Sequence, residues 1–435
     1  MTEASMRPTT FAARPRALLP RTDVLRHEVA AFRIGIAVIA LHVVDDNFLQ
    51  PEPGIAAGDH LVSGLVPLAV LGIVTLSYPH LRAPLRATLS LFLGLLAVLA
   101  AGAEAGYYAL QVGPSEDDYT GLLMIPAGLL LIAVGSLTLW SLRRSDGTRR
   151  RRYLRRLGYS LMVPLAGLLI IFPGIQAYID THAQNLTVPD ADLGAPYEDV
   201  SFKTSDGLTL AGWYVPSRNG AAVIVYPGRK GTQSHARMLV RHGYGVLVFD
   251  RRGEGASEGD PSPWVGNRDL KAALAFLAAR PDVEPERIGG LGLSVGGEML
   301  LQTAAETDAL KAVVSEGAGI RSYREFVELR DDTKWVTFPI MAAMSVSMAI
   351  LSNEAPPPDL TDLVGKIAPR PILLIHATNG QGGEELNATF YDAAGGPKSL
   401  WEITVGGHTG GIKALPDEYE RRVVEFLDGA LLDGQ

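Results

Sequence analysis

Five long apolar stretches occupy the first part of the 435-residue chain and limit what it can fold into. They cover residues 30–44, 61–78, 87–103, 121–142 and 157–179. Most of them approach or exceed the ~18 residues that an α-helix needs to cross the hydrocarbon core of a bilayer. A soluble bundle of buried helices is the alternative, but several such runs in succession are rare in soluble domains. The sequence therefore predicts an α-helical transmembrane bundle of about five spans.

Basic and acidic loops alternate between these stretches. Arginines precede the first stretch, Arg82 and Arg86 lie between the second and third, and segment 143–156 is rich in arginine. Loops 45–60 and 104–120 carry acidic residues and neither Lys nor Arg. Positive loops stay in the cytoplasm, so this alternation predicts a multi-pass cell-membrane protein with a cytoplasmic N-terminus. An odd number of spans then carries everything after residue 179 to the extracytoplasmic side.

The chain divides into four segments on these grounds. The N-terminal tail lacks the compact apolar core and small-residue cleavage site of a signal peptide, so the first span is expected to be a retained anchor. The segments are a cytoplasmic basic tail at 1–26, a transmembrane domain at 27–181, a polar linker at 182–196 and a second domain at 197–435.

Composition excludes several classes of function. The chain contains no cysteine, which rules out disulfides, thiolate metal sites and a cysteine nucleophile. The net charge of -8 is not the basic signature of a protein that binds nucleic acid. We expect no nucleic-acid partner.

Short apolar runs alternate with helical patterns after residue 197. Residues 200–204 and 208–215 are predicted to form paired antiparallel strands around a turn at 205–207. Later runs need burial on both faces, and helical patterns such as 269–279 and 297–305 separate them. This alternation predicts a mostly parallel sheet with helices on both faces. The later runs are 222–226, 245–249, 288–293, 312–315, 371–375 and 399–405.

Three motifs give this half a family resemblance. Residues 292–296 read Gly-Leu-Ser-Val-Gly, residues 250–259 read Asp-Arg-Arg-Gly-Glu-Gly-Ala-Ser-Glu-Gly, and His408 follows the last strand pattern. From about residue 198 to the C-terminus the chain resembles the α/β-hydrolase superfamily, which includes serine esterases, lipases and peptidases. The resemblance implies an α/β-hydrolase domain with a helical lid insertion at 321–369.

The resemblance also implies catalytic roles. Ser294 would be the nucleophile and His408 the general base, in the family's order of serine before histidine. The backbone N–H groups of Val295 and Arg229 would form the oxyanion hole. A turn serine in a nucleotide-binding glycine-rich loop is the alternative for Ser294, but the spacing Gly-x-Gly-x-x-Gly is absent here. Such a site needs no metal and no organic cofactor.

The acid of the expected triad departs from the family pattern. Gly380 stands where similar proteins carry an Asp. Glu316 is the preferred substitute, because it follows the strand next to the serine's own and its carboxylate would leave the carboxyl edge of the sheet. Glu384 is the alternative acid, with Glu385 beside it. Asp250 is expected to serve turn geometry, and Asp269 a solvated helix face.

The insertion contains an uncharged run at 336–351. Met341, Met344 and Met348 fall at helical spacing within it and predict one flexible apolar face. That face either packs on the hydrolase core as a cap or contacts an acyl chain or the membrane.

These features together predict a membrane-anchored serine hydrolase. It would cleave an ester or thioester of a small-molecule or lipid-like apolar acyl substrate through an acyl-Ser294 intermediate. Two alternatives remain open, a peptidase or amidase of the same fold and a catalytically impaired membrane sensor or scaffold. The missing Asp at position 380 favours the latter.

Overall fold

The computed structural model divides into two compact units. One comprises Met1–Asp45 with Pro67–Pro164, and the other Asp46–Val66 with Leu165–Gln435. The second unit therefore begins before the predicted linker at 182–196. The described residues are 21–49, 61–102, 105, 118–142, 158, 162, 166–329, 334–378, 380 and 382–432.

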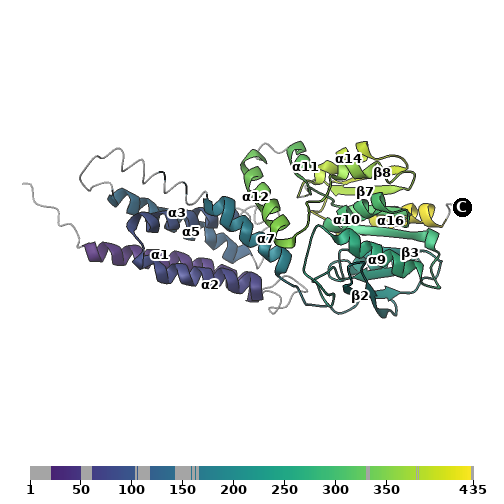
Figure 1. Cartoon of the computed structure of the whole chain (residues 1–435), viewed down its shortest axis with the longest axis horizontal. Coiled ribbons are helices and arrows are strands. Elements are labelled where there is room, and N and C mark those ends of the chain that lie inside the picture. The colour runs from purple at the N-terminus through teal and green to yellow at the C-terminus, as the bar shows by residue number, and fades with distance from the viewer. Residues whose placement is uncertain are drawn as a thin grey trace, which may run out of the picture. The chain divides into compact units, whose positions relative to one another are not determined.

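Helices occupy the described part of the N-terminal region (Figure 1). Two segments, Leu25–Leu49 and Thr120–Ser141, are long and apolar enough to cross a membrane. Gly64–His80 and Ala83–Leu96 are apolar but shorter, so the predicted number of about five spans is not established. The arginine-rich segment 143–156 and the start of the fifth predicted span lie outside the described residues. The elements are α1 (Arg21–Val44), η1 (Asp45–Leu49), α2 (Leu61–Ser77), η3 (Tyr78–His80), α3 (Ala83–Leu96), η4 (Ala97–Gly102) and α5 (Asp118–Leu142).

Helix α5 packs closely on α3 through glycines. A Cβ at Gly94 would lie 2.6 Å from the carbonyl oxygen of Gly128, and a Cβ at Gly128 would lie 2.6 Å from that of Gly94. Farther along α5, a Cβ at Gly135 would lie 2.7 Å from the carbonyl oxygen of Ala87. Small residues at such contacts allow helix backbones to approach closely.

The second unit is built on an eight-stranded sheet of order β1-β2-β4-β3-β5-β6-β7-β8 (Figure 1). The first two strands pair antiparallel, as the sequence predicts, and Lys203 lies opposite Thr209. β2 is also antiparallel to β4, and the remaining pairs are parallel. The strands are β1 (Glu198–Lys203), β2 (Thr209–Val215), β3 (Ala222–Tyr226), β4 (Gly245–Phe249), β5 (Ile288–Leu293), β6 (Ala312–Glu316), β7 (Ile372–Ala377) and β8 (Lys398–Ile403).

Helices cover both faces of this sheet and bury its apolar side chains in two clusters. α8 (Gln233–Arg241) and α16 (Pro416–Leu431) pack on one face. The other face is covered by α9 (Gly266–Ala278), α10 (Val295–Glu306), α13 (Leu360–Val364) and α14 (Asn387–Ala393). This is the α/β-hydrolase fold, as predicted. The short elements are η6 (Pro285–Arg287), η7 (Glu384–Leu386) and α15 (Gly411–Ala414).

The predicted insertion between β6 and β7 is helical. It contains α11 (Tyr323–Glu328), α12 (Lys334–Ser352) and α13. Phe338 of α12 packs on the rings of Tyr323 and Phe326, with centroids 6.3 and 5.7 Å apart. Helix α12 also contacts α7 (Phe172–His182), which continues from η5 (Gly167–Ile171).

Candidate active site

Ser294 occupies a strained turn between β5 and α10. Its backbone has φ 52° and ψ -125°, a region that residues other than glycine rarely adopt. The flanking glycines make the turn possible: a Cβ at Gly292 would lie 2.5 Å from the backbone of Gly296, and one at Gly296 would lie 2.5 Å from the carbonyl oxygen of Tyr226. The turn therefore holds the serine at the carboxyl edge of the sheet, at the N-terminus of a helix.

His408 contacts Ser294 from the loop that follows β8. Its Nε2 lies 2.9 Å from the serine Oγ, and its Nδ1 lies 2.5 Å from Oε1 of Glu384. A proton on Nδ1 donated to the Glu384 carboxylate leaves Nε2 free to accept from the serine hydroxyl. The structure thus brings together the predicted serine and histidine with the alternative acid.

The carboxylate of Glu384 fills the space that position 380 leaves empty. A Cβ at Gly380 would lie 2.3 Å from Cδ of Glu384, so a larger side chain there would displace the Glu384 carboxylate. Glu384 is 1% exposed, and its Oε2 accepts a 2.8 Å hydrogen bond from the N–H of Ala377. The neighbouring Glu385 is exposed. The longer glutamate side chain therefore reaches back from η7 to the position expected of the missing Asp.

Glu316, the acid preferred from the sequence, has other partners. It is the last residue of β6, so its side chain is directed onto one face of the sheet instead of leaving its edge. There it accepts hydrogen bonds from the Tyr419 hydroxyl at 2.6 Å and from the N–H of Gly411 at 2.8 Å. The prediction that Glu316 orients His408 is corrected on this point, and Glu384 takes that place.

The electrostatics of the site favour a basic imidazole. The hydrogen bond to Glu384 raises the pKa of His408 above its ordinary value of 6.5, and partial burial opposes this increase. A higher pKa makes Nε2 a stronger base towards the serine hydroxyl.

The two predicted oxyanion donors differ in the structure. Val295 is the first residue of α10, and its N–H has no acceptor among the described residues. The N–H of Arg229, in contrast, donates to Oδ1 of Asp250 at 3.2 Å. The same carboxylate accepts from Nε of Arg229 at 2.7 Å. Arg229 would have to release Asp250 before its backbone could serve as an oxyanion donor, which corrects its predicted role for this state.

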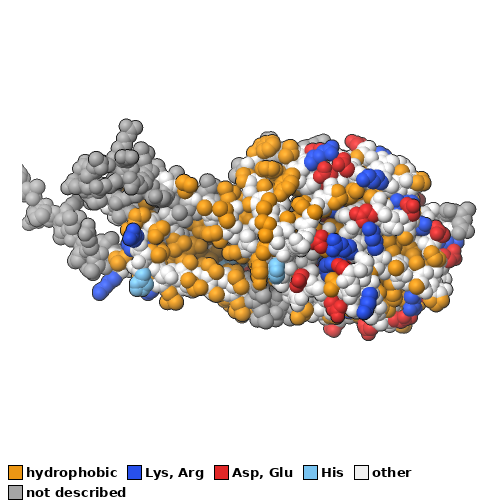
Figure 2. All heavy atoms as spheres, viewed as in Figure 1, with side chains coloured by type: hydrophobic (Ala, Val, Ile, Leu, Met, Phe, Trp, Pro, Cys, Tyr) orange, Lys and Arg blue, Asp and Glu red, His pale blue; other side chains and the backbone are white. Residues whose placement is uncertain are grey.

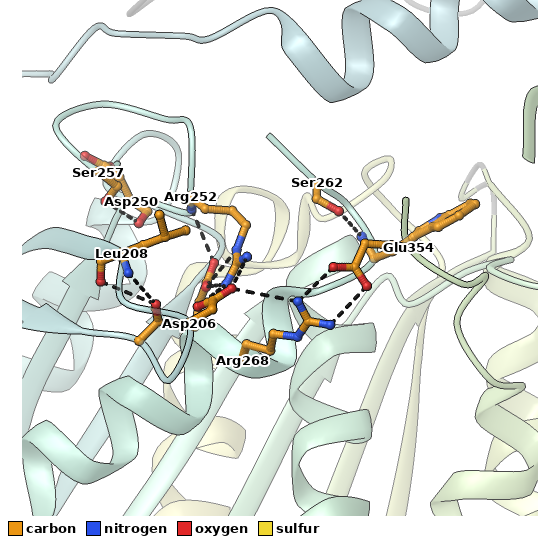
Figure 3. A network of polar contacts seen from close by, with 11 residues as sticks. Asp206, Leu208, Asp250, Arg252, Ser257, Ser262, Arg268 and Glu354 are labelled. Carbon is orange, nitrogen blue, oxygen red and sulfur yellow. Dashed lines mark hydrogen bonds and ion pairs between the residues drawn. The ribbon is translucent and has the colours of Figure 1, made fainter. Parts of the chain in front are cut away.

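A buried ion network holds the 250–259 loop beside the site (Figure 3). Arg252 binds Asp269 through Nε at 3.0 Å and Nη2 at 2.6 Å, and it also binds Asp206 at 2.9 Å. Arg268 extends the network to Glu354. Asp269, expected on a solvated face, is instead fully buried. The sequence shows that the loop is charged, but it does not predict that Arg252 binds Asp269.

Sequence reasoning also missed a buried glutamate on the serine's own helix. Glu298 lies one turn beyond Ser294 in α10 and accepts a 3.2 Å hydrogen bond from the N–H of Gly319. Burial raises its pKa to about 7. The only sequence feature that points to Glu298 is its position just after the Gly-x-Ser-x-Gly motif. Among the described residues, no group of three or more His, Asp and Glu side chains could hold a metal ion.

Known proteins resemble the part of the chain that forms the α/β-hydrolase fold. A family model described as X-Pro dipeptidyl-peptidase (S15 family) matches residues 193–361. The polyketide transferase grgF of Penicillium sp. is 35% identical over 130 residues, which cover 28% of this chain and 44% of that protein. Among solved structures, the Pyrococcus furiosus esterase Pf2001 gives a TM-score of 0.47 at 23% identity, covering 57% of this chain and 97% of that chain.

The protein YfhR of Escherichia coli K12, described as uncharacterized, is 30% identical over 253 residues. The matched region covers 54% of this chain and 81% of YfhR. The chain therefore belongs to the same family as YfhR, within the α/β-hydrolase superfamily.

Proposed function

We propose that the chain is a serine hydrolase that cleaves an ester or thioester of an apolar acyl substrate. The observation that carries the proposal is the chain of contacts from Ser294 through His408 to Glu384. A serine hydroxyl is a weak nucleophile unless a base takes its proton, and these contacts supply both the base and its orienting carboxylate.

The proposed reaction uses these residues in two half-reactions. His408 Nε2 takes the proton of Ser294 as Oγ attacks the acyl carbon, and the N–H of Val295 donates to the oxyanion that forms. Collapse of this intermediate breaks the bond to the leaving group, which departs as an alcohol or thiol with the proton from His408. Water then attacks the acyl-serine with the same base, releasing the acid and restoring the serine.

Peptide or amide cleavage is the second candidate. The match to the S15 peptidase model across residues 193–361 favours it, because that match covers the segment from the linker through the serine turn into the insertion. Ser294-dependent cleavage of X-Pro dipeptides from short peptides, without ester hydrolysis, would select this candidate.

Membrane anchoring is part of the proposal. Leu25–Leu49 and Thr120–Ser141 are long and apolar enough to span a bilayer. The glycine contacts between α3 and α5 are of the kind that drives helix association in lipid. We infer a multi-pass protein of the cell membrane, with its hydrolase unit on the extracytoplasmic side.

The experiment that tests the activity is labelling by a fluorophosphonate probe, together with hydrolysis of esters of increasing acyl length. Wild-type protein should react with the probe and hydrolyse esters. Ser294→Ala should abolish labelling, and His408→Ala should reduce ester hydrolysis by at least about 10³-fold. A folded wild-type sample that neither reacts nor turns over any ester or peptide would instead support the sensor or scaffold alternative.

A further inference from the structure

A cavity of about 620 Å³ lies within the second unit. Its lining includes residues of the loops that border the candidate site. Gly382 lines the cavity and accepts a 2.8 Å hydrogen bond from the N–H of Ile320, another lining residue. Gly382 also lies two residues before Glu384. On the side of the β3 loop, a Cβ at Gly228 would lie 3.8 Å from the carboxylate of Glu254, which lines the cavity too.

One face of α12 forms an apolar wall of this cavity. Met341, Met344, Ser345 and Met348 line it. Their spacing of three and four residues places them on one side of the helix. Methionine side chains are flexible and adapt to irregular apolar ligands, so this wall suits an acyl chain of variable shape.

The opposite face of α12 is also apolar, and its described side chains are largely exposed. Val346 is 53% exposed and Ile350 is 74% exposed. Trp335, near the start of the helix, is 60% exposed. A helix that is apolar all round is normally buried in protein or in lipid. The outer face of α12 therefore needs an apolar environment outside this unit.

Helix α7 and η5 extend the same exposed surface. Ile179, Asp180 and Ala183, at and just beyond the end of α7, line the cavity. Earlier residues of this segment, including Ile170 and Ile171, are 68% and 58% exposed. Figure 2 shows hydrophobic side chains gathered over α12 and α7. This segment overlaps the fifth predicted span, at 157–179.

The cavity also has a charged side. A ligand with an apolar chain and a polar group needs such a side for its polar group. Arg251 and Glu254 line it and bind each other, with Nε 3.0 Å from Oε2. Arg321 lines it as well, and its buried Nε has no hydrogen-bond partner among the described residues. Polar groups of a ligand could bind here while its chain contacts the methionines.

From these observations we propose that the cavity receives the acyl chain of a membrane lipid ester. The substrate enters from the bilayer across the α7–α12 surface, which rests in the lipid interface. The inference depends on the proposed serine hydrolase function and names the source and class of its substrate. We favour a lipid over a soluble ester because α7 and α12 share an apolar surface. That surface is continuous with a predicted span.

The test uses the full chain reconstituted into phosphatidylcholine vesicles. Hydrolysis of 4-methylumbelliferyl palmitate held in the vesicles is compared with hydrolysis of water-soluble 4-methylumbelliferyl acetate. Met344→Trp fills the cavity, and Ile350→Lys places a charge on the outer face. Each should lower the ratio of palmitate to acetate kcat/KM by at least about tenfold, because each blocks the chain or its entry.

The matched control is Ala275→Lys, which adds the same charge at an exposed position of α9. It should leave both activities unchanged. A ratio that Met344→Trp and Ile350→Lys do not alter, or that the control lowers equally, would overturn the inference. Ser294-dependent acetate hydrolysis without palmitate hydrolysis would also overturn it and leave the proposed function standing. Absence of both activities would count against the proposed function itself.

Discussion

The two glutamates that the sequence offers as the triad acid are both buried, but they have different partners. Glu384 contacts His408, whereas Glu316 joins Tyr419 and Gly411. We predict that Glu384→Gln lowers kcat by roughly 10²–10⁴-fold with an unchanged thermal midpoint, because the imidazole loses its anionic partner. Glu316→Gln should instead cost about 1–3 kcal/mol of unfolding free energy and change kcat by only a few-fold. The opposite pattern in paired kinetics and thermal melts would restore Glu316 as the acid.

The raised pKa of His408 predicts the acid limb of the pH profile. A protonated imidazole cannot take the serine proton, so kcat/KM falls as pH falls through this pKa. Because Glu384 raises that pKa above 6.5, the wild-type limb should have its midpoint above 6.5. In Glu384→Gln the remaining activity should show a limb at lower pH. A limb that does not move would mean that another group controls it.

A double variant tests whether a carboxylate at position 380 can replace the Glu384 carboxylate as the partner of His408. The Glu384 carboxylate occupies the space next to Gly380, so Gly380→Asp alone should clash and lose activity. In Glu384→Ala that space is vacant, and adding Gly380→Asp should recover at least about tenfold in kcat, since a Cβ at position 380 would lie 2.4 Å from the place of the Oε1 atom that contacts His408. Equal kcat values for Glu384→Ala and the double variant would show that position 380 cannot supply the acid in this chain.

These residues also show where sequence reasoning reached its limit. Ser294 and His408 were predicted because local motifs determine where a strand turns into a helix and which loop follows the last strand. For the acid the sequence offered Glu316 and, as the alternative, Glu384, and the preferred residue was wrong because the choice depends on side-chain direction. Glu316 ends its strand one residue later than expected, inside the sheet, and strand alternation then directs it onto the face covered by α16.

At the level of elements, the turn around Ser294 depends on glycines whose neighbours differ. A Cβ at Gly296 would lie 2.5 Å from the carbonyl oxygen of Tyr226 and 2.9 Å from the nitrogen of Pro227, both rigid backbone atoms. A Cβ at Gly297 would lie 2.4 Å from Oγ of Ser315, which can rotate away. We predict a loss of at least about 2 kcal/mol for Gly296→Ala and a change within about 1 kcal/mol for Gly297→Ala. Both variants make the same Gly-to-Ala change, so helix propensity does not distinguish them. Denaturant unfolding measures the free energy of each, and equal losses of unfolding free energy would contradict the prediction.

The strands were predicted closely because buried parallel strands are continuous apolar runs bounded by polar loops. The runs at 222–226, 245–249 and 288–293 coincide with β3, β4 and β5. Long-range ion pairs are not encoded in this way. Asp269 falls on a helical pattern that suggests a solvated side, and only the folded chain brings it to Arg252. The sequence predicts such elements well and their charged contacts poorly.

For the whole molecule, the number of membrane crossings decides on which side the hydrolase unit works. Alternating loop charge predicts an odd number, so the N-terminal tail and the hydrolase unit should lie on opposite sides. Because the chain contains no cysteine, single substitutions can report this without background. On spheroplasts, a membrane-impermeant maleimide should label Ala278→Cys, at an exposed position of α9, directly. It should label Ser5→Cys, in the basic tail, only after permeabilisation. Labelling of both sites on intact spheroplasts would require an even number of crossings and place the N-terminal tail outside as well. Labelling of Ala278→Cys only after permeabilisation would instead place the hydrolase unit in the cytoplasm and move the proposed lipid substrate to the cytoplasmic leaflet.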